Sequence, residues 1–224
     1  MADQLRCLGF DFSEPGSLEA FFEKHWAGKA VIDMAEGVYL RLTCGRQIVC
    51  ILSVDPETQE VLDWDMHFMD GEAVGCSFVE DLALDEAGQS GTLRLCLDPA
   101  GVELPVIVSA PMLAPWSDRE PGSPGLARLA AYAEELTLPE EIAEDLTVDE
   151  EACAMELRAH VVSAERFLCP DTGRRPWLLR VTCRGVALPL LCAEEQLTRL
   201  PSAGQAVSAR CVMTALVESG TSAG

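Results

Sequence analysis

A two-residue alternation of apolar and polar side chains recurs along most of this 224-residue chain. It is clearest from Val61 to Met69 (VLDWDMHFM), where every second side chain is apolar. Because successive side chains of a strand point to opposite faces, this period is typical of strands with one buried face. Similar runs fill the first 110 and the last 65 positions, and the sequence therefore predicts a mainly β (α+β) protein.

Residues 1–115 are predicted to form a β-rich N-terminal domain, a meander of strands with one covering helix. The helix is expected over residues 17–26 (SLEAFFEKHW), where apolar side chains recur at helical spacing before a glycine. The strands are expected at residues 38–44, 48–52, 61–69, 74–79, 93–97 and 102–108.

A proline-rich run at residues 111–124 marks the end of this domain. The following GLARLAAYAEEL has apolar residues at Leu126, Leu129, Ala133 and Leu136, a stripe that predicts a helix. A second short helix is expected from Pro139. Residues 134–151 contain acids and no base, so residues 116–152 are interpreted as an acidic helical connector.

From residue 153 to 217 the pattern predicts three strands, a short helix and a final strand, with a bulge at Val161 and Val162. This order resembles the OB fold, a small five-stranded barrel, and the resemblance implies an OB-like C-terminal barrel. Gly185 and Gly204 lie in turns that suit it, whereas Pro189 falls inside its third strand, where proline requires an edge or a bulge. Residues 218–224 are expected to be a flexible tail.

A short repeat links the two halves. LRLC from Leu93 and GVELPVIV from Gly101 are similar to LRVTC from Leu179 and GVALPLLC from Gly185. We interpret the match as a coincidence between apolar hairpins, and a duplicated barrel is the alternative.

Charge and cysteine usage restrict the classes of partner. The formal net charge is −21, which disfavours nucleic acid and an anionic membrane surface and favours a cationic partner or plain solubility. Most of the 10 cysteines lie in apolar strand-like runs without a CxxC motif, so they are interpreted as reduced core residues. With no signal-peptide pattern and no membrane-length apolar run, a cytoplasmic location is expected. No cofactor is indicated.

Three candidate sites remain. Asp63, Asp65 and His67 point to one side of a predicted strand and are possible metal ligands, although a solvated strand face is the favoured interpretation.

A second candidate is the predicted barrel hairpin, because guanidinium groups and an aromatic side chain are what OB domains use on single-stranded nucleic acid. The alternative places the tryptophan in the core and the arginines on the wet face. The residues are Arg174, Arg175, Trp177, Arg180 and Arg184.

The third candidate is the acidic connector, whose charge is suited to binding a basic protein. The alternative is that this stretch is solvated surface with no partner. Its residues are Glu140, Glu141, Glu144, Asp145, Asp149 and Glu150.

No phosphate-binding loop, nucleophile motif or catalytic triad is recognisable in the sequence. We therefore expect a non-catalytic binding protein, with a basic protein as the favoured partner. A single-strand nucleic-acid-binding protein and a metal-dependent hydrolase using Asp63, Asp65 and His67 are the alternatives.

Overall fold

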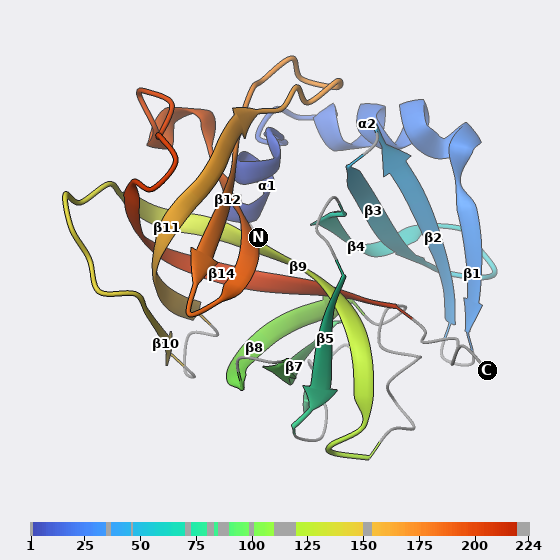
Figure 1. Ribbon diagram of the computed structural model, residues 1–224. Coiled ribbons are helices and arrows are strands. Elements are labelled where there is room, and N and C mark those ends of the chain that lie inside the picture. Colours follow the sequence, from blue (N-terminus) through green and yellow to red (C-terminus); the bar gives the residue numbers. More distant parts are fainter. Residues whose placement is uncertain are drawn as a thin grey trace.

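The computed structural model describes residues 2–34, 37–45, 47–69, 73–79, 83–84, 90–98, 101–109, 120–149 and 154–218. Two sheets dominate it, with short helices at one side (Figure 1), which confirms the mainly β fold. The proline-rich run up to residue 119, Glu150 and residues 219–224 lie outside the described residues.

The smaller sheet is a four-stranded antiparallel meander in chain order. Its strands are Ala30–Met34 (β1), Gly37–Cys44 (β2), Ile48–Val54 (β3) and Val61–Phe68 (β4). The predicted helix is present as Ser17–His25 (α2), followed by a 3-10 turn at Trp26–Gly28 (η1). An additional helix, Ala2–Leu8 (α1), and strand β1 were not predicted.

The larger sheet has ten strands among the described residues. Their bounds are Ala73–Phe78 (β5), Ala83–Leu84 (β6), Ser90–Leu97 (β7), Val102–Ser109 (β8), Pro124–Thr137 (β9), Asp145–Asp149 (β10), Ala154–Arg166 (β11), Trp177–Cys183 (β12), Val186–Cys192 (β13) and Ala206–Glu218 (β14). A 3-10 turn, Glu194–Gln196 (η2), precedes β14.

The strands of this sheet close into two hydrogen-bonded rings that share β9 and β14. The first ring runs β5–β7–β8–β14–β9 and back to β5, and the second runs β11–β12–β13–β9–β14 and back to β11. In both rings all contacts are antiparallel except one, which is β8–β14 in the first and β13–β9 in the second. Figure 1 shows β9 and β14 side by side across the centre, with the first ring below and the second at the left.

The sequence repeat occupies equivalent places in the two rings. Leu97 pairs with Val102 in the β7–β8 hairpin as Cys183 pairs with Val186 in the β12–β13 hairpin. Further along, an arginine faces a proline in both: Arg94↔Pro105 and Arg180↔Pro189. Both copies therefore have the same register in the same part of a ring, which favours the alternative of a duplicated barrel.

The helix predicted over residues 125–136 is also wrong, because this segment is strand β9. Its inward residues, among them Leu129 and Ala131, lie in the core of the rings, while Ala130 and Tyr132 face a second core outside. A strand buried on both faces loses the two-residue alternation, so its spacing resembled a helix. Residues 138–144 likewise form no helix, and β10 follows them.

Within residues 153–217 the predicted strands, the short helical turn and the bulge between Val161 and Ser163 are confirmed. The ring is not confined to that range, however, because β9 closes it from outside the predicted bounds.

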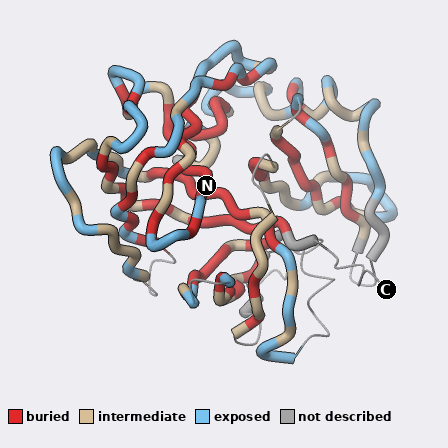
Figure 2. The backbone as a smooth tube through the Cα atoms, in the orientation of Figure 1, coloured by how far each residue is buried: buried red, intermediate tan, exposed pale blue. Residues whose placement is uncertain are grey.

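The two cores meet on the β12–β13 hairpin. Its inward side chains, such as Leu179 and Leu190, lie in the core of the rings, whereas Leu178 and Leu191 face the second core, beneath the small sheet and its helices. Figure 2 shows the buried stretches continuing along the central strands. Tyr132 joins the two parts, since its hydroxyl accepts a hydrogen bond of 2.9 Å from the backbone N–H of Phe68.

Candidate functional site

A cleft lies where β9 changes partners. β9 pairs with β5 as far as Arg128 and with β13 only at residues 131 and 132, so the two partners diverge around Leu129. Pro189, just before the β13 residues that pair with β9, has no N–H to donate, which is consistent with the missing ladder. The opening measures about 520 Å³. We call it the inter-ring cleft, and its lining residues are Val74, Leu97, Asp98, Arg128, Leu129, Val162, Arg180, Val181, Gly185, Val186, Ala187, Leu188 and Pro189.

The cleft combines an apolar lining with charged groups from both rings. Arg128 stands on the shared strand β9 and Arg180 on β12 of the second ring. Asp98 follows β7, and its backbone N–H bonds to the carbonyl of Gly75 at 3.0 Å. Val162, at the bulge of β11, is 54% exposed. The described lining therefore combines two guanidinium groups, one carboxyl group and aliphatic side chains.

The equivalent position in the first ring is chemically different. There the guanidinium of Arg94 makes an ion pair of 3.7 Å with Glu103, which sits diagonally across the hairpin. By register, the counterpart of Glu103 in the second ring is Ala187. The cleft wall thus carries a methyl group where the first ring carries a carboxylate.

Only one of the predicted hairpin residues lines the cleft, namely Arg180. Trp177 is buried in the core, and its indole N–H donates to the carbonyl of Glu194 at 3.2 Å, which confirms the core interpretation. Arg174 pairs with Asp11 at 3.0 Å, and Arg175 is exposed with its backbone N–H bonded to the Glu194 carboxylate.

The acidic residues predicted to dock a partner are largely engaged within the chain. Arg184 forms an ion pair with Asp145 at 2.6 Å, and its backbone N–H bonds to Glu144 at 2.7 Å. Glu144 also contacts Nδ1 of His160 at 3.0 Å. These bonds, first from the Arg184 backbone and then from His160, lower the pKa of Glu144.

Further along the same acidic surface, Arg210 contacts Asp149 at 3.2 Å, Glu134 at 3.3 Å and Glu156 at 3.5 Å. Two of the predicted surfaces, the acidic connector and the arginine hairpin, therefore meet and partly neutralise each other. Glu140 and Glu141 remain exposed in the segment between β9 and β10.

The predicted metal ligands on β4 are divided between different surroundings. His67 is fully buried and lies 3.1 Å from the Asp65 carboxylate, while Asp63 is partly exposed. Asp65 also accepts hydrogen bonds from the backbone N–H of Met66 and from Gln4 of α1. In the part of the chain that the structure describes, no group of three or more such side chains is placed to hold a metal ion.

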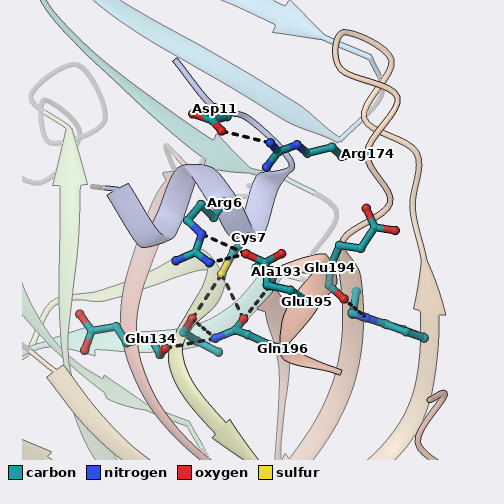
Figure 3. A network of polar contacts seen from close by, with 11 residues as sticks. Arg6, Cys7, Asp11, Glu134, Arg174, Ala193, Glu194, Glu195 and Gln196 are labelled. Carbon is teal, nitrogen blue, oxygen red and sulfur yellow. Dashed lines mark hydrogen bonds and ion pairs between the residues drawn. The ribbon is translucent and has the colours of Figure 1, made fainter. Parts of the chain in front are cut away.

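A polar network next to α1 forms a second, smaller pocket of about 330 Å³ (Figure 3). Arg6 pairs with Glu195, and the side-chain amide of Gln196 donates to the backbone carbonyls of residues 133 and 134 at 3.0 and 3.1 Å. The thiol of Cys7 lies 3.4 Å from the first of these carbonyls. The network fixes α1 and η2 against β9, which explains it as a structural contact.

Eight of the nine described cysteines are buried, and all nine are free thiols. Burial raises the pKa of Cys76 to about 11 and that of Cys211 to about 12. A thiol is reactive as its thiolate, so burial makes Cys76 and Cys211 poor nucleophiles.

The described fold is thus a pair of five-stranded rings with a cleft between them and a smaller sheet packed alongside. No protein-family model matches the chain, and no curated protein matches it. None of the described helices has the length and apolar character required to cross a bilayer.

The cleft was missed at the sequence level, apart from Arg180, because its walls come from strands far apart in the chain. Arg128 was assigned to a helix, and Asp98 and Val162 lie in separate segments. The proline shared by the two hairpins was the one visible signal of an interrupted ladder.

Proposed function

We propose that this chain is a non-catalytic binding protein that holds its ligand in the inter-ring cleft. The observation that carries the proposal is the opening beside Pro189, lined by Arg128, Arg180 and apolar side chains. Its volume lies within the range of about 300–1,000 Å³ typical of ligand sites. The ligand class that fits is a molecule with a carboxylate or phosphate group and an apolar part.

We also infer that each ring is an OB-like barrel. Five strands, one parallel closing contact and a short helical turn before β14 agree with that description. OB domains bind ligands on the face of their second and third strands, which in the second ring are β12 and β13. Arg180 and Ala187 line the cleft from these two strands. Fold analogy supports the location of the site but not the identity of the ligand.

The other candidate partners have less support. The described lining residues of the cleft include no aromatic side chain on which a base would stack, so single-stranded nucleic acid is disfavoured. Docking of a basic protein would use an acidic surface that is already partly neutralised by Arg184 and Arg210. The predicted cytoplasmic location remains part of the proposal, and free thiols are typical of a reducing compartment.

Native mass spectrometry of the purified protein, after incubation with the small-molecule fraction and separately with the peptide fraction of a cell extract, tests the proposal. Arg180→Gln is compared with Arg94→Gln, which removes the matching arginine of the first ring. We expect a bound species whose occupancy falls about tenfold or more in Arg180→Gln, as loss of a charge-assisted hydrogen bond implies, and is unchanged in Arg94→Gln. Equal binding by both variants, or conversion of a component of the extract into product, would contradict it.

A further inference from the structure

The correspondence between the two rings extends from their hairpins to the strands that close them. β5 corresponds to β11, β7 to β12, β8 to β13 and β9 to β14, because strands paired in one ring have counterparts paired at the same register in the other. The matched pairs are Ala73↔Arg128 and Glu156↔Arg210, Ser77↔Cys96 and His160↔Thr182, and Ile107↔Thr214 and Leu191↔Tyr132. Each of these positions in one ring therefore has a defined counterpart in the other.

Strand β10 is the element that breaks this correspondence. It pairs with β11, where Leu146 faces Leu157. The counterpart of Leu157 in the first ring is Val74 of β5. On the side of β5 away from β9, β7 pairs with residues 76–78, and no strand among the described residues pairs there with residues 73–75. The place that β10 takes in the second ring therefore has no strand in the described part of the first.

Leu146 of β10 closes the junction between the two hairpins on its own side. Its side chain packs against the core of the rings and lines a remaining cavity of only about 10 Å³. The other residues around this cavity are Leu97, Val102, Leu104, Cys183, Arg184, Val186 and Leu188. The inter-ring cleft shares Leu97, Val186 and Leu188 with this cavity and adds Val74, but it measures about 520 Å³. The cleft therefore includes the counterpart of the space that Leu146 fills.

The two matched residues beside these places differ in burial. Leu157, which faces Leu146, is 0% exposed, whereas Val74 is only partly buried although it packs against the same core. Burial of such an aliphatic wall by an apolar group is favourable, because it removes apolar surface from water. The described lining of the cleft has no aromatic side chain that would stack on a ring, so an aliphatic group is the better match.

We propose that the ligand of the inter-ring cleft is a small aliphatic carboxylate, whose chain occupies beside Val74 the place that Leu146 occupies beside Leu157 and supplies most of the affinity. The inference rests on the proposed function and specifies the apolar part of its ligand. Each methylene buried in the cleft is expected to strengthen binding about threefold to fourfold, until the chain outgrows the space.

Isothermal titration of the full chain with unbranched carboxylates from pentanoate to decanoate tests this inference. We expect the affinity to rise about threefold to fourfold per methylene at the start of the series and then to level off. The primary alcohol that matches octanoate removes the charge and keeps the chain. Its loss of affinity relative to octanoate is expected to be smaller than the loss on shortening octanoate to pentanoate.

Two variants at Val74 locate the chain. Val74→Trp fills the place with an indole, and Val74→Thr replaces one methyl group by a hydroxyl with little change in volume. Octanoate binding is expected to weaken about tenfold or more in Val74→Trp and about threefold in Val74→Thr. Leu126→Trp is the matched control, because Leu126 is an exposed residue of β9 outside the described lining, and it should bind octanoate as the unchanged protein does. Circular dichroism checks that each variant is folded.

The outcomes separate the inference from the proposed function. Affinity that is independent of chain length but lower in Val74→Trp overturns the role of the aliphatic chain and leaves the cleft as the site. Equal affinity in both Val74 variants and the unchanged protein means that the chain binds elsewhere, which overturns the inference. Absence of binding by every member of the series also overturns it. In these last two cases the comparison of Arg180→Gln with Arg94→Gln by native mass spectrometry decides the proposed function.

Discussion

The two rings have the same strand order and the same hairpin register, yet the described lining of the cleft comes mostly from β12 and β13 of the second ring and, from the first-ring hairpin, only from Leu97 and Asp98. In the first ring Glu103 holds Arg94 in an ion pair. In the second ring Ala187 stands at the corresponding position and lines the cleft beside Arg180. The two hairpins therefore share their backbone register and differ at one matched position in the side chain that lies diagonally across from the arginine.

The rings also differ in their outer surroundings. The hairpin of the second ring places Leu178 and Leu191 beneath the small sheet and its helices, whereas the far end of the same hairpin borders the cleft. One half of its outer face therefore contributes to a core and the other half to a candidate site. This division gives the site a rigid support, which favours preorganised binding.

The largest expected effect tests whether the rings are equivalent in stability. Leu104 and Leu188 occupy matching positions and are 0% and 2% exposed. Leu104→Ala and Leu188→Ala are each expected to lower the free energy of unfolding by about 2–5 kcal/mol, because each leaves a cavity in the core of the rings. Urea unfolding followed by circular dichroism measures this. Since β9 and β14 belong to both rings, a single transition is expected in each variant, and two separate transitions would show that the rings unfold independently.

The next prediction introduces the carboxylate of the first ring, that of Glu103, at the matching position of the second ring. Ala187→Glu places a carboxylate diagonally across from Arg180, as Glu103 is from Arg94. Binding of a cleft ligand is expected to weaken about tenfold or more, with the free energy of unfolding changed by less than about 1 kcal/mol. Isothermal titration with a ligand identified by native mass spectrometry measures the affinity, and Ala187→Ser is the matched control. Unchanged affinity in Ala187→Glu would remove the basis for the comparison.

A smaller effect concerns acid sensitivity of the contact between β10 and the second ring. The pKa of Glu144 is lowered by its bonds from the Arg184 backbone and from His160. A carboxyl group whose folded pKa is lowered stabilises the fold above its unfolded pKa, near 4.3, and this contribution is lost as the pH falls through the folded value. Glu144→Gln is therefore expected to cost less than about 1 kcal/mol at pH 7, since the group is partly exposed, and less at pH 3 than at pH 7. Urea titrations of both proteins at the two pH values test this, and a constant difference would contradict it.

The smallest expected effect is at an exposed ion pair. Arg174 and Asp11 are both 43% exposed. Arg174→Ala is expected to change the free energy of unfolding by less than about 0.5 kcal/mol, with the difference reduced further in 1 M NaCl. A loss above about 1 kcal/mol would show that this pair, and not only the apolar core, holds the β11–β12 connection against the N-terminal segment.

The sequence was informative where a turn signal separates two strand-like runs. Strands were expected at residues 177–183 and 186–192, and β12 and β13 have these bounds, because aliphatic runs flank an Arg-Gly turn in which Arg184 and Gly185 both have positive φ, 49° and 81°. β9 was misassigned because Leu129 and Tyr132 belong to two different cores, a property of tertiary packing that its composition does not reveal.

The candidate site was less predictable for the same reason. The divergence of β5 and β13 along β9 depends on pairings between segments far apart in the sequence. The repeated Arg–Pro pairing was visible in the sequence, but only the hydrogen-bond register showed that Ala187 replaces Glu103.

Hydrogen exchange beside the inter-ring cleft tests the central claim most directly. With a ligand identified by native mass spectrometry bound, the backbone amide of Ala187 is expected to exchange at least about tenfold more slowly than in the free protein, while that of Glu103 at the matching position of the first ring stays unchanged. Equal changes at both amides, or no change at Ala187, would contradict the assignment of the ligand to this cleft.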